Sequence, residues 1–263
     1  MSLKKMKEKQ FTNGTVYAME TEDGYPIEVT DTFLPYYTKD AIGRKQNILH
    51  SGEPGSRLER WMIGVSVMSG CPVGCRFCAT ASLPKCRYLR SDEILSQIQF
   101  VLDQNPEIHP DDCKEFKINY TRMGEPFLNL HAVQETIARI NAAYPNAHHY
   151  VSTIGIKGAE FSWIRENITL QFSVHSFDET YRDWLIPYPR KMSLEEIGKV
   201  RTGSNLKTTI NLTLVRDDDF SIQALQRLFD PNVHFIKLSP INPNCVSESN
   251  HMGAGVITQT NLI

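Results

Sequence analysis

Apolar runs of strand length alternate with segments of helical periodicity from residue 61 onward. The strand-length runs cover 61–69, 115–121, 148–154, 168–175, 208–215 and 234–241. The helical segments cover 91–104, 130–144, 158–166, 177–186, 193–201 and 221–230. In 91–104, Ile94, Ile98 and Val101 share one face, and Ser91 stands in the N-cap position. Strands that alternate with helices build parallel βα units, so the pattern predicts an α/β fold, a partial (β/α)6 parallel barrel.

The first 60 residues follow a different pattern. Two short segments, 14–20 and 25–30, flank Asp23-Gly24, a dipeptide typical of tight turns, and predict a β-hairpin. Residues 40–60 are rich in Gly, Ser and charged residues, which favours a loop. We therefore expect three regions, namely an N-terminal extension over 1–60, a core over 61–245 and a C-terminal tail over 246–263.

Composition and charge limit the classes of function. Hydrophobic residues make up 41% of the 263 residues and charged residues 22%, so a packed core is feasible. The net charge of −2 gives no support to a large basic surface for nucleic acid, although it leaves room for a local patch. No apolar stretch reaches the ~18 residues of a membrane span, and the polar sequence after Met1 contains no signal region. We therefore expect a cytoplasmic protein with no membrane association.

Three of the six cysteines, Cys71, Cys75 and Cys78, lie within eight residues. They follow the first predicted strand of the core, and parallel α/β folds form active sites at the carboxyl ends of such strands. In a chain without a signal region this clustering favours metal binding over disulfides. The spacing C-x3-C-x2-C suits a [4Fe-4S] cluster whose fourth iron stays open for another ligand. A zinc site that adds Cys86 is the alternative, and unliganded core cysteines fit poorly with the Pro, Gly and Arg residues between them.

Further motifs follow the cysteines along the chain. They are Cys78-Ala79-Thr80-Ala81, Arg87-Tyr88-Leu89, Glu93-Ile94-Leu95-Ser96-Gln97, Met123-Gly124-Glu125-Pro126-Phe127-Leu128-Asn129, Ser152-Thr153-Ile154-Gly155, Ser173-Val174-His175 and Asn242-Pro243. Together with the cysteine spacing, this set resembles the RlmN/Cfr-like family of radical S-adenosylmethionine (SAM) rRNA methyltransferases. The resemblance covers residues from about 61 to 245 and implies a radical SAM core there.

The resemblance implies a role for each motif. Cys71, Cys75 and Cys78 would hold the cluster, whose open iron would bind the amino and carboxylate groups of SAM. Glu125 would accept hydrogen bonds from the SAM amino group, although Glu125-Pro126 alone is also typical of a helix entry. Other SAM contacts are implied for residues near strand ends and for the aromatic residue before the last cysteine: Gly124, Ser152, Ser173, His175, Asn242 and Phe77. The reduced cluster would donate an electron to SAM, and the resulting 5′-deoxyadenosyl radical would abstract hydrogen from a substrate.

The match departs from the family at the two accessory cysteines that transfer the methyl group. One lies seven residues before the first cluster cysteine, where this chain has Gly64. The other lies well beyond the Asn-Pro motif, and we expect it to be missing here, since the sequence ends at Ile263. Cys245 and Cys86 are candidates for a catalytic role, and the alternative is that each is simply a small hydrophobic residue. Cys113 is expected to be structural or incidental.

Two classes of function follow from these residues. The first is a radical SAM enzyme that acts on RNA or a nucleoside, with a small molecule, a peptide or a glycyl-radical partner as the alternative substrate. Such an enzyme needs an electron donor such as flavodoxin or ferredoxin. A local phosphate-binding patch would come from basic residues, whose alternative is a solvated surface: Arg87, Arg90, Arg182, Arg190 and Lys191. The second class is a non-catalytic metal-binding module, which would need four protein ligands.

Overall fold

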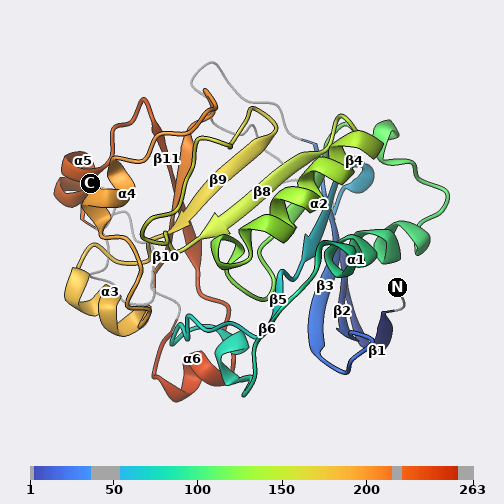
Figure 1. The fold of residues 1–263 in the computed structure, drawn as a ribbon, viewed down its shortest axis with the longest axis horizontal. Helices are drawn as coiled ribbons and strands as arrows, with labels where there is room; N and C mark the ends of the chain where they lie inside the picture. Colours follow the sequence, from blue (N-terminus) through green and yellow to red (C-terminus); the bar gives the residue numbers. More distant parts are fainter. Residues whose placement is uncertain (1–2, 37–53, 215–220, 254–263) are drawn as a thin grey trace. The chain divides into compact units, whose positions relative to one another are not determined.

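The computed structural model of the chain describes residues 3–36, 54–214 and 221–253. Contacts divide the chain into two compact units, the first made of 1–69, 88–123 and 129–150 and the second of 70–87, 124–128 and 151–263. Figure 1 shows the elements coloured along the sequence. Strand β8 (His148–Thr153) has residues in both units.

The first unit contains mostly antiparallel strands. Its strands follow one another across the sheet as β1 (Lys4–Phe11), β2 (Gly14–Glu20), β3 (Pro26–Leu34), β4 (Ser56–Val65) and β7 (Phe116–Tyr120). Neighbours from β1 to β4 pair antiparallel, whereas β4 and β7 pair parallel. The unit also contains helices α1 (Ser91–Asp103) and α2 (Leu130–Ala143) and the short turn η2 (Pro110–Asp112). Both helices bury one apolar stripe, as amphipathic periodicity requires.

The predicted hairpin is confirmed as β2 and β3. Three other details of the first unit differ from the prediction. A third strand, β1, precedes the hairpin and is exposed along its whole length, so it has no apolar face to reveal it. Strand β4 begins at Ser56, within the predicted loop, while residues 37–53 lie outside the described part of the chain. Helix α1 has Arg90 rather than Ser91 at its N-cap, since Arg90 is extended and Ser91 is already helical, and the Glu93 carboxylate accepts the Arg90 amide at 2.8 Å.

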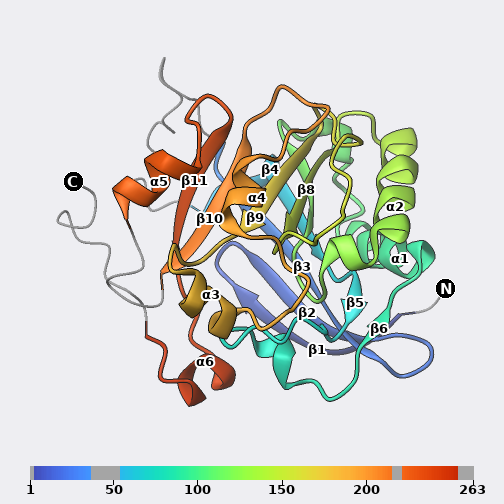
Figure 2. The ribbon, with the colours of Figure 1, turned by 60° about the vertical axis from the view of Figure 1, so that its left-hand side comes forward.

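Parallel strands form the sheet of the second unit. After the last residues of β8 come β9 (Ile168–Ser173), β10 (Thr208–Leu214) and β11 (His234–Pro240), and β10 pairs parallel with both of its neighbours. Figure 2 shows these strands with helices of the same unit around them. The helical elements are η1 (Ala79–Ser82), η3 (Pro126–Leu128), α3 (Glu179–Leu185), α4 (Leu194–Gly198), α5 (Ile222–Leu228) and α6 (Cys245–Ser249). Buried Phe172, Val174, Ile210 and Leu212 line the sheet.

The predicted strand positions are confirmed, whereas one predicted helix is wrong. Residues 158–166 form turns that start at Gly158, whose φ is +82°. Phe161 and Ile164 are buried, so the apolar spacing that predicted a helix instead fills the core from an irregular segment. Helix α6 begins at the last residue of the predicted core and continues into the predicted tail, of which residues 254–263 lie outside the described part. The division at 60 and 245 stays a prediction.

Among the helices of the described residues, none combines the length and the hydropathy needed to cross a membrane.

Candidate functional site

The three clustered cysteines lie in segment 70–87 of the second unit, between the two-residue strands β5 (Met68–Ser69) and β6 (Arg87–Tyr88). Gly70 opens the segment with φ +69°, and a Cβ there would lie 2.4 Å from the Lys85 carbonyl oxygen. Glycine is therefore needed at this turn, both for its backbone angle and for the close approach of the two chains.

Cys71, Cys75 and Cys78 are free, half-buried thiols. The Cys78 amide donates to the Cys75 carbonyl at 3.1 Å, which closes a tight turn between the two residues. Burial raises the pKa of Cys75 well above its ordinary range, and the neighbouring Cys78, Cys71 and Glu125 raise it further. Burial likewise raises the pKa of Cys71 to about 12, with Glu125 and Cys78 adding to the effect. The three thiols and the Glu125 carboxyl thus lie close enough to influence one another's ionisation.

Glu125 lies in the loop after β7, next to Gly124, whose φ is +102°. Its side chain is buried and held by two backbone amides: Phe127 donates to Oε1 at 3.1 Å and Ile154 donates to Oε2 at 3.0 Å. Burial raises the Glu125 pKa to about 7, although these amides and the Thr153 hydroxyl oppose the shift. The Phe127 bond resembles the expected helix entry, since the 3-10 turn η3 follows directly.

The predicted residues on β8 and β9 lie side by side. The Oγ atoms of Ser152 and Ser173 are 3.3 Å apart, and the Gln171 amide donates to Ser152 Oγ at 3.4 Å. Both serines are half-buried, so their hydroxyls are partly open to a ligand.

His175 follows β9 in a left-handed conformation, with φ +64°. Its Nδ1 accepts the Thr213 amide at 3.0 Å, so the neutral imidazole carries its proton on Nε2. Burial lowers the His175 pKa to about 3, and the positive charge of Arg182 adds to the shift. The Phe77 ring packs edge-on against the imidazole, with centroids 4.8 Å apart. The structure therefore brings together two residues that lie almost 100 positions apart in sequence.

Asn242 is exposed in the loop after β11, and its carbonyl accepts the Asn244 side-chain amide at 3.0 Å. Its described hydrogen bond thus stays within this loop instead of reaching the group around Glu125. The same Asn244 amide donates to the Phe77 carbonyl at 2.9 Å, so the loop does contact the cysteine segment. Neither Asn244 nor Asn250, which bonds the Arg76 carbonyl at 3.0 Å, was singled out from sequence. The only available signal is that Asn244 is a favourable N-cap residue.

The other cysteines have different surroundings. Cys86 is exposed, and so is Cys245 at the first position of α6. Cys113 is half-buried in the first unit, with its sulfur 3.8 Å from the His109 carbonyl oxygen. Within the described residues, no three His, Cys, Asp or Glu side chains converge on a single metal ion. A cubane cluster binds each thiolate through a different iron, so its ligands stand farther apart than those of one ion.

Arg182 is fully buried, which corrects its assignment to a surface phosphate patch. Its Nη1 donates to the Met192 carbonyl at 2.7 Å and lies 3.5 Å from Glu179, while Nη2 donates to the Ile154 carbonyl at 3.2 Å. In sequence, a charged residue on a predicted helix suggests solvent exposure. The backbone carbonyls that Arg182 contacts cannot be identified from sequence.

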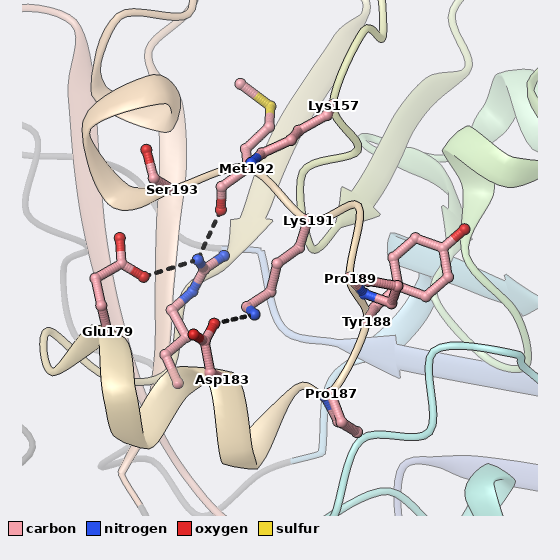
Figure 3. Close-up of a pocket in the computed structure, with 10 residues that line it drawn as sticks. Lys157, Glu179, Asp183, Pro187, Tyr188, Pro189, Lys191, Met192 and Ser193 are labelled. Atoms are coloured by element: carbon pink, nitrogen blue, oxygen red, sulfur yellow. Dashed lines mark hydrogen bonds and ion pairs between the residues drawn. The ribbon is translucent and has the colours of Figure 1, made fainter.

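Arg182 also lines a pocket of about 570 Å³ between α3 and residues 187–193, drawn in Figure 3. The charges in its wall are largely paired with one another, since Lys191 contacts Asp183 and Arg182 contacts Glu179. This pairing leaves the pocket with no evident preference for an anionic or a cationic ligand.

Known proteins are similar to the chain in sequence and in fold, although no family model matches it. A probable dual-specificity RNA methyltransferase RlmN from Desulfitobacterium hafniense is 32% identical over 197 residues, which are 70% of this chain and 55% of that protein. A probable RNA methyltransferase from Rhodopirellula baltica is 30% identical over 181 residues, 65% of this chain and 47% of the relative. The chain therefore spans about half the length of the curated relatives it matches.

A crystal structure of a radical SAM methyltransferase from Sphaerobacter thermophilus aligns with a TM-score of 0.72 at 24% identity, covering 97% of this chain and 71% of the other. The mixed α/β fold with its large parallel sheet is thus that of a radical SAM partial barrel, as predicted. The sequence matches identify the family within this fold class. The chain belongs to the radical SAM superfamily and, within it, to the relatives of the RlmN-like RNA methyltransferases.

Proposed function

We propose that this chain is a radical SAM enzyme that holds a [4Fe-4S] cluster on Cys71, Cys75 and Cys78 and modifies RNA or a nucleoside. The observation that carries the proposal is the grouping of these three thiols with the buried carboxyl of Glu125. The RNA substrate is supported by the relatives that are named as RNA methyltransferases.

The donor set fits an iron–sulfur cluster. Burial keeps the Cys71 and Cys75 thiols neutral, with a pKa of about 12 for Cys71, so thiolates form at these two positions only against compensating positive charge. A metal-bound thiol is deprotonated outright, so the three sulfurs would bind iron as thiolates. Three such ligands leave one iron of a cubane for the amino and carboxylate groups of SAM. When bound, the reduced cluster supplies the electron that splits SAM into methionine and a 5′-deoxyadenosyl radical.

Glu125 is suited to bind the SAM amino group. The carboxylate accepts two backbone amides and the Thr153 hydroxyl, which leaves one further lone pair for an incoming donor. Its pKa of about 7 means that the carboxyl is poorly compensated in the absence of a ligand. A cationic amino group would form charge-assisted hydrogen bonds with the carboxylate and lower this pKa.

The remaining residues would position the rest of SAM. His175, neutral and protonated on Nε2, would donate one hydrogen bond, and the Phe77 ring beside it would pack near the adenine. Ser152 and Ser173 offer paired hydroxyls to the polar groups of the ligand. We also assign Gly124 and the exposed Asn242 to this set, on the basis of their motifs.

Methyl transfer by the two-cysteine route does not fit position 64. A Cβ on Gly64 would lie 2.3 Å from Thr30 Oγ1 and 3.1 Å from Arg122 Cδ, so neighbouring side chains fill the space that a cysteine would need. We therefore propose that the enzyme makes 5′-deoxyadenosine without methylating rRNA adenine by this route. Exposed Arg90 and Arg190 remain candidates for phosphate contacts.

The first test is cluster binding and SAM cleavage in the full chain. After anaerobic reconstitution, we expect iron and sulfide in cubane ratio, and 5′-deoxyadenosine on addition of SAM and a reductant. Cys75→Ala should lose both signals while keeping its fold, whereas Cys113→Ala, a control outside the motif, should keep both. A Cys75→Ala variant that cleaves SAM at the wild-type rate would exclude the cluster assignment.

The second test separates the reaction from methyl transfer. Intact-mass measurement after turnover with SAM and RNA should show no added CH2 group on Cys245 or Cys86, and the RNA should gain no methyl group. A methylated cysteine together with methylated RNA would restore the methyltransferase interpretation.

A further inference from the structure

Arg76 and Phe77 are the two residues between Cys75 and Cys78, and the carbonyl of each is held by an asparagine from the segment after β11. The Asn250 amide donates to the Arg76 carbonyl at 3.0 Å, and the Asn244 amide donates to the Phe77 carbonyl at 2.9 Å. These partners are 174 and 167 residues apart in sequence. In Figures 1 and 2, helix α6 accordingly lies beside the cysteine segment that contains η1.

Both asparagines are fixed in orientation by their own helix. Asn244 is the N-cap of α6, and its Oδ1 accepts the amides of Val246 at 3.0 Å and Ser247 at 3.2 Å. With its oxygen held in this way, its NH2 group must point toward Phe77. Asn250 follows the last turn, where its amide also donates to the Val246 carbonyl at 2.9 Å.

Helix α3 holds the same turn through the preceding peptide and the Arg76 side chain. The Arg76 amide donates to the Leu185 carbonyl at 3.0 Å, and Arg76 Nε donates to the Trp184 carbonyl at 2.9 Å. The guanidinium also lies over the Trp184 ring, 5.0 Å from its centroid. The turn that spaces the second and third cysteines is thus fixed by side chains and backbone of two helices.

We infer that Asn244 and Asn250 are positioning residues that set the geometry of the cluster loop before iron binds. A peptide group is planar, so a hydrogen bond to its carbonyl also fixes the directions of the flanking Cα atoms and of the next amide. Fixing both peptides holds Cys75 and Cys78 at one spacing and lowers the ordering cost of binding. This inference rests on the proposed function, because it assumes that the loop holds the cluster.

The test compares two single variants, their double mutant and a control variant with the wild type. Asn244→Ser keeps an N-cap oxygen for α6 but loses the donor to Phe77, and Asn250→Ala loses the donor to Arg76. Ser249→Ala is the matched control, since Ser249 is exposed on the same helix and its hydroxyl bonds within that helix. We expect hydrogen exchange at residues 76–78 of the metal-free chain to accelerate in the first two variants and in their double mutant, but not in the control.

The second measurement is the rate of iron loss to a chelator after reconstitution. Since residues that orient metal ligands typically contribute 10–100-fold to affinity, we expect the double variant to lose iron at least about 10-fold faster than the wild type. Unchanged exchange, or faster exchange with wild-type iron retention, would overturn the positioning role. A wild-type chain that takes up no iron would instead overturn the proposed function, and the inference with it.

Discussion

Two buried carboxylates, one in each unit, are treated differently by their surroundings. In the first unit, Asp31 forms an ion pair with Arg57 at 2.7 Å and accepts hydrogen bonds from Trp61 Nε1 at 2.8 Å and the Asn105 amide at 3.2 Å. In the second unit, Glu125 is held by two backbone amides, and burial raises its pKa to about 7. Asp31 is compensated by a cation from its own chain, whereas no cation is among the groups that shift the Glu125 pKa, and we propose that a ligand supplies one.

The largest effect should come from removing the charge of Asp31. Asp31→Asn leaves Arg57 without its buried partner, so we expect the free energy of unfolding to fall by about 3 kcal/mol in urea titrations. SAM binding by the folded variant should stay near the wild-type level. Asp92→Asn, which removes an exposed pair with Arg139, should change the free energy of unfolding by less than about 1 kcal/mol.

In the metal-free protein, the charge of Glu125 should destabilise the fold, whereas that of Asp31 stabilises it. This effect of Glu125 should appear as a dependence of stability on pH. The unfolded carboxyl ionises near its ordinary pKa of 4.5 and the folded one near 7, so between these values the folded state keeps a proton that the unfolded state has lost. The stability of the fold therefore falls as pH rises through this window, by up to about 3 kcal/mol.

Buried histidines with lowered pKa values, including His149 and His175, act in the opposite direction over part of the same pH range. The measurement is therefore the difference in unfolding free energy between Glu125→Gln and the wild type. This difference should grow in favour of the variant from about pH 5 to pH 8, and a constant difference would contradict the raised pKa.

A smaller effect is expected on ligand affinity. Glu125→Gln keeps the shape of the side chain but removes the charge-assisted bond to an amino group, which is worth about 1.5–3 kcal/mol. SAM affinity of the reconstituted protein, measured by calorimetry, should fall about 10- to 100-fold. Glu160→Gln, at an exposed position of the same unit, should bind SAM normally. Destabilisation like that of Asp31→Asn, with unchanged affinity, would make Glu125 a structural residue.

The smallest effect concerns the hydroxyl of Thr153, which lowers the Glu125 pKa by hydrogen bonding. Thr153→Val removes this bond with little change in volume, so the Glu125 pKa should rise further. The pH midpoint of SAM binding should then move upward by less than about 1 unit. A downward shift would show that Thr153 does not stabilise the carboxylate.

Much of the fold could be predicted because its central strands are apolar runs of the right length. The run 168–175 corresponds to β9, along which buried and half-buried residues alternate, and the run 234–241 corresponds to β11, where only His234 is fully buried. The exposed strand β1 has no such signal. The segment 158–166 has helical spacing of apolar residues but forms turns, because the same spacing also serves an irregular segment that packs into the core.

The site was predictable where residues follow strands and unpredictable where distant segments meet. The positions of Glu125, Ser152, Ser173 and His175 near strand ends follow from the alternation of strands and helices, and their assigned roles remain predictions. The bonds of Asn244 and Asn250 to the cysteine turn depend on how a segment some 170 residues later folds back. Buried Arg182 shows the same limit, since its carbonyl partners at Ile154 and Met192 are set by tertiary structure.

The hydrogen bond from Asn250 to Arg76 also constrains the order of events during synthesis. The cysteine turn is translated early, but its partner at residue 250 leaves the ribosome 174 residues later. Until then the nascent turn lacks the asparagine contacts that hold its carbonyls in the folded chain. Under the proposed function, a cluster would therefore enter the finished turn only after residue 250 has been made and has docked on it.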